Sequence, residues 1–424
     1  PDATAAAAGE THHDKEEPVS RVATEPKLAA RARSLEVSPT VAMASRARAL
    51  KAKGVRVLDF TVGEPDQPTP RHIADAGKAA IDAGQTKYAP ASGIADLRSA
   101  VVERYLADFG VSFASEQVTI TVGGKQALAL LYQAILDGGS EIVIPIPAWP
   151  TFSEAARVVG GKPVLVPLSV EDGFRITARA IARKVGPKTR AVMVNSPSNP
   201  TGAVIDPTEL LKLARLAKQR GFWLLYDDTY AHLVFREGGA APLQEVNDAA
   251  GGRLVVVGTA SKSYCMTGWR VGWLIGPKAL ADATTALNSH SVQGPATFAQ
   301  VAAAQALRGP QDELRRMHAE YRRRRDFVHP RVAAIPGVVC PEPQGGFYVF
   351  PDVSRCLTKA LPDTLALGEK LLEEKAVAVV PGEGFHAPGT FRLSFATAFE
   401  DLQEGVARLE AFFAEHATPG RVRR

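Results

Sequence analysis

The feature that most constrains this chain is a series of short, wholly apolar runs that alternate with helical stretches. Six runs predict buried strands: VTITV (118–122), EIVIPIP (141–147), AVMVN (191–195), FWLLYD (222–227), LVVVG (254–258) and VGWLIG (271–276). Segments between them have helical periodicity, such as KQALALLYQAIL (125–136) and DPTELLKLARLAKQRG (206–221). Strands that are apolar throughout are buried on both faces. The pattern therefore predicts an α/β fold with a mostly parallel sheet covered by helices on both sides.

Length and a change of pattern along the chain predict two domains. The 424 residues exceed one ordinary hydrophobic core. Residues 61–310 carry the alternating pattern and predict a large domain. Residues 311–424, which contain strand-like segments such as GGFYVFPDV and FRLSFA, predict a smaller α+β domain together with residues 36–60. Residues 1–35 mix alanine with charged residues, which indicates a disordered N-terminal extension.

The charge pattern argues against a nucleic-acid partner. The formal net charge is +5, but the basic residues are scattered. The densest run, YRRRRDF (321–327), lies in a helical stretch, where a solvated helix face is the favoured interpretation. No apolar stretch is long enough for a membrane span. We therefore expect neither nucleic acid nor a membrane as a partner.

The spacing of cysteine and histidine predicts no metal site. Cys265, Cys340 and Cys356 are too widely spaced for a disulfide framework or a metal centre. His12 and His13 stand in a polar tail without a further ligand, so we expect them to be solvated. A reducing cytoplasm is the default location for such a chain.

Polar groups follow the predicted strands, at the sheet edge where ligands bind in folds of this kind. After the first strand come Gly123 and Gly124, then a helix that we expect to open at Lys125. Backbone N–H groups and the helix dipole at such a turn favour an anion, although many turns of this type contain glycine. Trp149 follows the second strand, where it would either stack on a flat ring or pack in the core.

The next strand ends carry groups of stronger chemical character. A carboxylate that leaves an apolar strand is costly to bury unless it meets a cation. A lysine at such a place is either an exposed side chain with a buried stem or a nucleophile whose amine is kept partly neutral. In chain order the groups are Asn199 in the rigid turn SPSNPTG, then Asp227, Asp228 and Tyr230, and finally Ser261, Lys262 and Arg270.

Together these groups match the requirements of pyridoxal phosphate. Its phosphate needs an anion site, its ring needs a flat partner, and its pyridine nitrogen stays protonated only beside a carboxylate. Its aldehyde forms a Schiff base with a lysine amine. The combination favours the nucleophile as the interpretation of Lys262.

The sequence resembles the fold-type I, class I aminotransferases, and is especially similar to the prokaryotic-type aspartate and aspartate/prephenate branch. The resemblance runs from about residue 36 to about residue 415. It rests on the ordered motifs TVGEPDQPTP, TKYAPASGIADLR, TVGGKQAL, NSPSNPTGAV, YDDTY, SKSYCMTGWRVGW, GGFYVF, VVPGEGF and RLSFA. It implies the aspartate aminotransferase fold, with a mixed, mostly parallel seven-stranded sheet in the large domain.

The resemblance also implies roles for individual residues. Lys262 would be the Schiff-base lysine, Asp227 the partner of the pyridine nitrogen, and Tyr230 and Asn199 the partners of the ring hydroxyl. The remaining implied roles are the phosphate site (the backbone of Gly124 and Lys125, with Ser261, Arg270, and Tyr88 from the neighbouring subunit of a homodimer), the α-carboxylate site (Arg392, with Gly63 and Trp149 beside it) and the Lys125 side chain as the partner of a distal carboxylate. The implied reaction is ping-pong transamination between aspartate or glutamate and a 2-oxo acid.

Some positions depart from the family pattern near the expected pocket. Asp228 and Thr229 stand where Glu-Ile is usual, SKSYCMTG replaces a commoner Ala-Phe-Ala, and Ala148 replaces a tyrosine. Two alternatives therefore stay open. One is an elimination, replacement or carbon–carbon bond-forming enzyme of specialised metabolism that uses the same cofactor. The other is a non-catalytic regulator, against which the presence of Lys262 argues.

Overall fold

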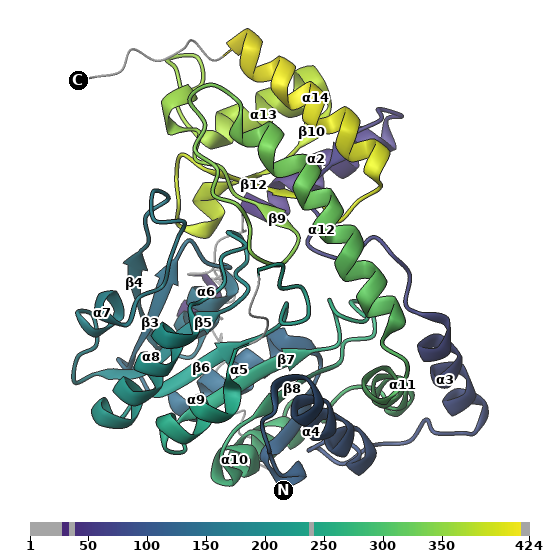
Figure 1. Cartoon of the computed structure of the whole chain (residues 1–424). Coiled ribbons are helices and arrows are strands. Elements are labelled where there is room, and N and C mark those ends of the chain that lie inside the picture. The colour runs from purple at the N-terminus through teal and green to yellow at the C-terminus, as the bar shows by residue number, and fades with distance from the viewer. Residues whose placement is uncertain (1–27, 34–38, 237–240, 417–424) are drawn as a thin grey trace, which may run out of the picture. The chain divides into compact units, whose positions relative to one another are not determined.

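The computed structural model describes residues 28–33, 39–236 and 241–416 (Figure 1). The chain divides into two compact units, Pro1–Glu36 and Val37–Arg424. In the first unit the structure describes one short helix, α1 (Ala30–Arg33). The rest of the predicted extension, including His12 and His13, lies outside the described residues. Everything below concerns the second unit.

A seven-stranded sheet forms the centre of the second unit. Its strands are β2 (Val118–Thr121), β3 (Glu141–Ile146), β4 (Lys162–Pro167), β5 (Thr189–Asn195), β6 (Trp223–Asp227), β7 (Leu254–Thr259) and β8 (Gly272–Ile275). The spatial order is β2-β8-β7-β6-β5-β3-β4. β8 is antiparallel to both of its neighbours, and the other pairs are parallel. This mixed, mostly parallel sheet confirms the predicted fold class.

The apolar runs predicted six of these seven strands, and β4 is the exception. It lies at the edge of the sheet, is mostly half-buried, and contains Pro163 and Pro167. Proline lacks the N–H that a central strand needs, so it is confined to edges and strand ends. The weak apolar signal and the prolines explain why the sequence pattern did not predict this strand.

Both faces of the sheet are buried, as the apolar runs required. Along β5, Val192 and Val194 enter one core cluster, whereas Ala191 and Met193 enter another on the opposite face. This alternation follows from the two-residue period of a strand. The surrounding helices are α3 (Arg71–Asp82), α4 (Ala95–Phe109), α5 (Gly123–Ile135), α6 (Thr151–Val158), α7 (Ala178–Ala182), α8 (Pro207–Arg220), α9 (Leu243–Ala250), α10 (Lys278–Ser289) and α11 (Thr297–Arg308) (Figure 1).

Local signals set the ends of the helices. At α8, the Asp206 side chain accepts a hydrogen bond from Thr208 N at 2.8 Å, and Gly221 ends the helix with φ of 79°. Helix α5 begins at Gly123, two residues before the predicted opening at Lys125. The glycine pair is therefore part of the first helical turn.

The remaining elements form a second group around smaller sheets. These are α2 (Pro39–Ala52), β1 (Leu58–Asp59), α12 (Asp312–Ala333), β9 (Tyr348–Val349), α13 (Thr364–Lys375), β10 (Val377–Ala378), β11 (Val380–Pro381), β12 (Phe391–Ser394) and α14 (Phe399–His416). β11, β12 and β9 form an antiparallel sheet, and β1 pairs with β10 in parallel. The β1–β10 pair joins segments from opposite ends of the chain.

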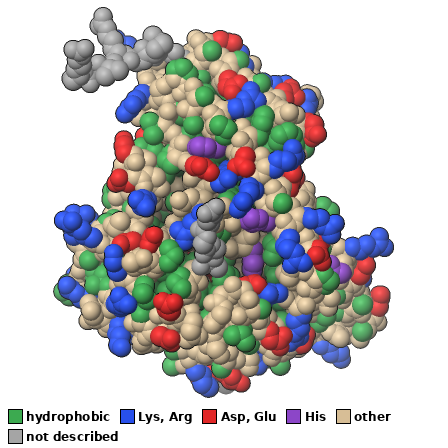
Figure 2. Space-filling view, viewed as in Figure 1, with side chains coloured by type: hydrophobic (Ala, Val, Ile, Leu, Met, Phe, Trp, Pro, Cys, Tyr) green, Lys and Arg blue, Asp and Glu red, His purple; other side chains and the backbone are tan. Residues whose placement is uncertain are grey.

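The arginine run of 321–327 lies in α12, as expected, but it is not a solvated face throughout. Arg324 is only 6% exposed and pairs with Asp66 at 2.9 Å. Arg323 pairs with Glu320, and Arg325 pairs with Glu342. On the face shown in Figure 2, basic side chains lie among acidic ones rather than in one patch. In the described part of the chain, no helix combines the length and apolar character that crossing a membrane requires.

Candidate active site

Lys262 lies just after β7, inside a ring of charged groups. Its Nζ donates a hydrogen bond of 2.7 Å to the Gly63 carbonyl oxygen. Burial lowers the pKa of Lys262 to about 8, with Glu64 opposing the shift and the cations Arg392, Arg270 and Lys125 adding to it. An amine with such a pKa is partly neutral near physiological pH, so it can act as a base or nucleophile.

Asp227, the last residue of β6, is a buried carboxylate that lacks a cationic partner among the described residues. It is 4% exposed, and its Oδ1 accepts a hydrogen bond from Thr229 N at 3.0 Å. Burial raises the pKa of Asp227 to about 6, and the bonds from Thr229 limit the rise. A cation placed beside this carboxylate would restore its ordinary ionisation.

A chain of polar contacts joins the sheet edge to the smaller sheet. The Arg392 guanidinium, on β12, donates from Nη1 to Asn199 Oδ1 at 3.0 Å and from Nη2 to the Thr61 carbonyl oxygen at 2.7 Å. The hydroxyls of Tyr230 and Tyr348 lie 2.9 Å apart. These contacts bring four of the predicted site residues, Lys262, Asn199, Tyr230 and Arg392, to one region through Gly63 and Tyr348.

The surroundings of the Arg392 guanidinium favour an anion as its partner. Its guanidinium lies 4.5 Å from the Tyr348 ring centroid and 5.2 Å from that of Phe385. Its Nε is buried and has no hydrogen-bond partner among the described residues. A side chain at Gly63 would crowd this region, because an added Cβ would lie 3.2 Å from the Tyr348 hydroxyl. An unpaired buried donor is costly, so a carboxylate is the natural partner of this group.

The start of α5 forms a cradle for a second anion. Gly123 has φ of 73°, and an added Cβ would lie 2.5 Å from Arg270 Nη2, so glycine lets the arginine lie against the turn. An added Cβ at Gly272 would meet the Gly124 nitrogen at 2.7 Å. The Ser261 hydroxyl lies 2.8 Å from that of Thr259. Free N–H groups at a helix start, an arginine and hydroxyls suit a phosphate.

Lys125 and Trp149 lie together at a more exposed position. Lys125 Nζ is 5.2 Å from the Trp149 ring centroid, and the Trp149 ring stands edge-on to Phe152 at 5.5 Å. Lys125 is exposed and has no ion-pair partner among the described residues. Trp149 is therefore neither fully buried core nor free surface.

Tyr88 is the one predicted site residue that the fold does not bring to the others. Its side chain is 94% exposed. Residues 86–89 and 292–298 line a hollow of about 600 Å³ there. Within the described residues, no hydrogen bond joins Tyr88 to the cluster around Lys262.

Several residues that build the site were not predicted from the sequence. Thr61 and Tyr348 contact Arg392 or Tyr230, Phe385 covers the Arg392 guanidinium, and Asn195 Nδ2 donates to the Asp227 carbonyl oxygen at 3.2 Å. All four stand in motifs that carry the family resemblance: Thr61 in TVGEPDQPTP, Asn195 in NSPSNPTGAV, Tyr348 in GGFYVF and Phe385 in VVPGEGF. The motifs marked these positions, but the sequence assigned no role to them.

Asp228, one of the atypical residues, faces away from the cluster into a buried polar network. Its Oδ2 accepts a 2.6 Å hydrogen bond from the Tyr105 hydroxyl, which itself accepts one from Trp273 Nε1 at 3.1 Å. Burial raises the pKa of Asp228 to about 8, and the nearby Asp227 charge adds to the rise, although the Tyr105 bond opposes it.

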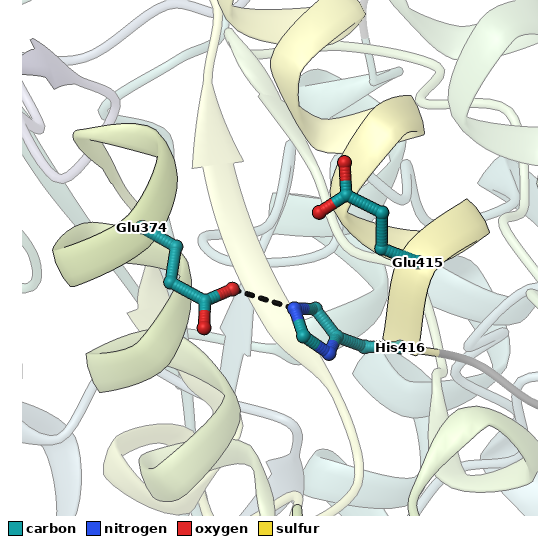
Figure 3. A group of neighbouring side chains, drawn as sticks. All are labelled: Glu374, Glu415 and His416. Atoms are coloured by element: carbon teal, nitrogen blue, oxygen red, sulfur yellow. Dashed lines mark hydrogen bonds and ion pairs between the residues drawn. The ribbon is translucent and has the colours of Figure 1, made fainter.

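One group of possible metal ligands lies elsewhere, between α13 and α14. Figure 3 shows Glu374 bonded to His416, with Glu415 beside them. Lys370 pairs with Glu374 and Lys375 pairs with Glu415, each at 2.7 Å. The carboxylates are already compensated at the surface, so this group supports no metal site.

Comparison with known proteins identifies the class that this fold and site define. The model of the family "Aminotransferase class I and II" matches residues 55–409. The chain belongs to this family, and it is an aminotransferase, a transferase enzyme. The resemblance stated from the motifs is thereby confirmed.

The similar proteins narrow the class further. A probable aspartate/prephenate aminotransferase of Aquifex aeolicus is 40% identical over 92% of this chain and 99% of its own length. An aspartate aminotransferase of Geobacillus stearothermophilus is 37% identical over 92% of this chain and 100% of its own. The solved aspartate aminotransferase of Thermus thermophilus with maleate has a TM-score of 0.86 at 38% identity, covering 91% of this chain and 100% of that one.

Proposed function

We propose that this enzyme transfers the amino group between an acidic amino acid, aspartate or glutamate, and a 2-oxo acid by a ping-pong mechanism. The carrying observation is the pair of cations near Lys262: Arg392, with its unpaired buried Nε, and Lys125, without an ion-pair partner among the described residues. A dicarboxylic substrate offers one carboxylate to each. The names of the similar aspartate aminotransferases support the same substrate class.

Pyridoxal phosphate is the cofactor that these residues fit. The backbone of Gly124 and Lys125, with Ser261 and Arg270, would hold its phosphate at the start of α5, where the absent Cβ of Gly123 makes room. Asp227 would pair with its protonated pyridine nitrogen, which supplies the cation that this carboxylate lacks. Tyr230 and Asn199 would contact the ring hydroxyl, Trp149 would cover the ring, and Lys262 would attach the cofactor covalently.

The chemistry that bound pyridoxal phosphate supplies is an electron sink for the charge left when a proton leaves the substrate Cα. The chain's own groups do the rest. Arg392 binds the α-carboxylate through its planar fork, and Lys125 binds the distal carboxylate. When it is not bonded to the cofactor, the Lys262 amine can take the proton from the substrate Cα as a base and release it again as an acid. Its lowered pKa of about 8 allows both steps near neutral pH. Asp227 stays ionised beside its cation.

A homodimer completes this proposal. We infer that Tyr88 reaches the phosphate of the neighbouring subunit, since its side chain is 94% exposed and is separate from the cluster of its own chain. We also propose that residues 61–310 form the large cofactor-binding domain, that residues 311–424 form the small C-terminal domain, and that residues 36–60 form an N-terminal arm and part of the small domain. We also place the enzyme in the cytoplasm, which its three free cysteines favour.

A half-reaction tests the proposal directly. Purified enzyme loaded with pyridoxal phosphate is mixed with single amino acids, and the visible spectrum is followed for conversion to the pyridoxamine form. Aspartate or glutamate should convert the enzyme at the lowest concentrations, with release of the matching 2-oxo acid. If acidic donors convert it no better than neutral ones, or if the products are those of elimination, the proposal is wrong.

A further inference from the structure

A histidine outside the proposed machinery links the two loops that carry it. His232 follows Tyr230 by two residues, and Ser263 follows Lys262 directly. His232 Nδ1 lies 3.0 Å from Ser263 Oγ. This contact ties the segment after β6, which carries Tyr230 and directly follows Asp227, to the segment after β7, which carries Lys262.

The far side of the His232 ring is also fixed. His232 Nε2 lies 2.7 Å from Asp108 Oδ2, and Arg104 pairs with Asp108 Oδ1 at 2.6 Å. Burial opposes ionisation of Asp108, but the bond from His232 and the charge of Arg104 outweigh it and hold the pKa of Asp108 below its usual value. Arg104 and Asp108, which we call the anchor of His232, lie on α4, and this helix packs on the sheet.

The anchor fixes the direction of the hydrogen bond at His232 Nε2. An ionised Asp108 only accepts, so His232 Nε2 carries a proton and donates it. In the neutral ring Nδ1 is then the acceptor, and the Ser263 hydroxyl donates to it. The rings of Phe109 and Tyr264 flank the histidine at 5.9 and 6.2 Å, which restricts its rotation.

We propose that His232 is a positioning residue that holds Lys262 in register with Tyr230 and Asp227, acting through the hydroxyl of Ser263. This inference rests on the proposed transamination, in which the Lys262 amine must reach a proton at a defined place. Small displacements of a proton-transfer group are costly to rate, whereas substrate binding by Arg392 and Lys125 depends on other contacts. The effect is therefore expected in kcat rather than in KM.

Two amide substitutions separate the two sides of the ring. In His232→Asn the side-chain amide replaces Nδ1 and can keep the bond to Ser263, and in His232→Gln it replaces Nε2 and keeps the bond to Asp108. Ser263→Ala removes the hydroxyl alone. We expect His232→Gln and Ser263→Ala to lower kcat about 3- to 10-fold, as for the loss of one neutral hydrogen bond, and His232→Asn to lower it less.

A second readout does not depend on turnover. The pH at which the visible absorbance of the pyridoxal phosphate holoenzyme changes should move by about half a unit or more in His232→Gln and Ser263→Ala, and stay near wild type in His232→Asn. Combining His232→Gln with Ser263→Ala should add little to either change, because both break the same contact. His329→Gln is the matched control, since His329 bonds the Cys340 carbonyl oxygen far from these loops.

The proposal is overturned if the Asn and Gln variants fall equally, or if Ser263→Ala leaves both kcat and the spectral midpoint unchanged. Ser263→Ala deletes one oxygen, so it keeps the test informative if a histidine variant folds poorly. Wild-type transamination with acidic donors is measured first. Its failure refutes the proposed function, whereas an active wild type with unaffected variants refutes only the role of His232.

Discussion

The floor of the site and its rim hold similar charged groups in contrasting surroundings. We define the floor as Lys262, Asp227 and Arg392, and the rim as Lys125 and Trp149. Floor groups are largely buried and bonded to backbone or to neighbouring side chains, such as Lys262 to the Gly63 carbonyl and Arg392 to that of Thr61. Lys125 is exposed, and the interaction described for it is with the Trp149 ring, whose centroid lies 5.2 Å from Lys125 Nζ.

This contrast separates chemistry from selection. Burial lowers the pKa of Lys262 to about 8 and raises that of Asp227 to about 6, so it favours the neutral form of both groups. The Lys262 amine can therefore exchange a proton near pH 7, whereas Asp227 would stay ionised beside the cation of the cofactor. The exposed amine of Lys125 stays hydrated when it has no partner, so an unpaired state costs little free energy. It can bind only substrates that extend far enough to reach it. Floor substitutions should therefore affect every substrate, and replacement of the rim lysine only some.

The largest effect is expected for Lys262→Ala. The variant should fold and still bind pyridoxal phosphate through the cradle at α5, but it should lose the covalent link and about three or more orders of magnitude of kcat. Steady-state assays and the visible spectrum measure both. Lys278→Ala, at an exposed lysine paired with Asp282, is the control. Near wild-type turnover of Lys262→Ala would contradict the assignment.

Arg392→Ala should give the next largest loss. Every amino acid carries an α-carboxylate, so kcat/KM should fall by about two to three orders of magnitude for acidic and neutral donors alike, as when one partner of a buried charge pair is removed. Arg392→Lys keeps the charge without the planar fork and should recover only part of the loss. A loss confined to acidic donors would place Arg392 at the distal carboxylate instead.

Lys125→Ala tests the rim. It should lower kcat/KM for aspartate and glutamate by about one to two orders of magnitude, mainly through KM, because a charge-assisted hydrogen bond of roughly 1.5 to 3 kcal/mol is lost. Neutral donors should change little. A parallel fall for both donor classes would mean that Lys125 serves the cofactor phosphate, and Lys125→Arg should then restore both classes together.

The floor was more predictable from the sequence than its supports. In the floor, Asp227 ends an apolar strand and Lys262 follows the next one, and Asn199 follows a third strand beside them. Because carboxyl ends of parallel strands share one edge, the local pattern predicts that these residues meet, whereas Arg392 was expected there only from the family resemblance. Thr61 contacts Arg392 across 331 residues, and Tyr230 contacts Tyr348 across 118, so these pairs depend on how the two sheets are placed. Periodicity within a segment carries no information of that kind.

Burial of polar residues was predicted least well. The run YRRRRDF predicted a solvated helix face, yet Arg324 is buried because Asp66, from the loop that carries Gly63, supplies its countercharge. The edge strand β4 was not predicted, because its half-buried positions and prolines weaken the apolar pattern. For Arg324 the tertiary partner decides the environment, and for β4 its place at the edge of the sheet does.

The smallest effect on turnover is expected for Asp228→Asn, which probes a buried carboxylate beside the floor but outside it. The raised pKa of about 8 means that the folded protein keeps a proton on Asp228 at neutral pH, and asparagine preserves the bond from Tyr105, so kcat should stay near wild type.

Stability should differ instead. Between the ordinary aspartate pKa near 4 and about 8, the unfolded chain releases this proton and the folded one does not, so wild-type stability falls with rising pH. Urea unfolding of the apoprotein should show the variant gaining on wild type by up to about 1.4 kcal/mol per pH unit in that window and no further above it. Asp282→Asn, at an exposed position, should run parallel to wild type, and a parallel course for Asp228→Asn as well would show that Asp228 is ionised in the fold.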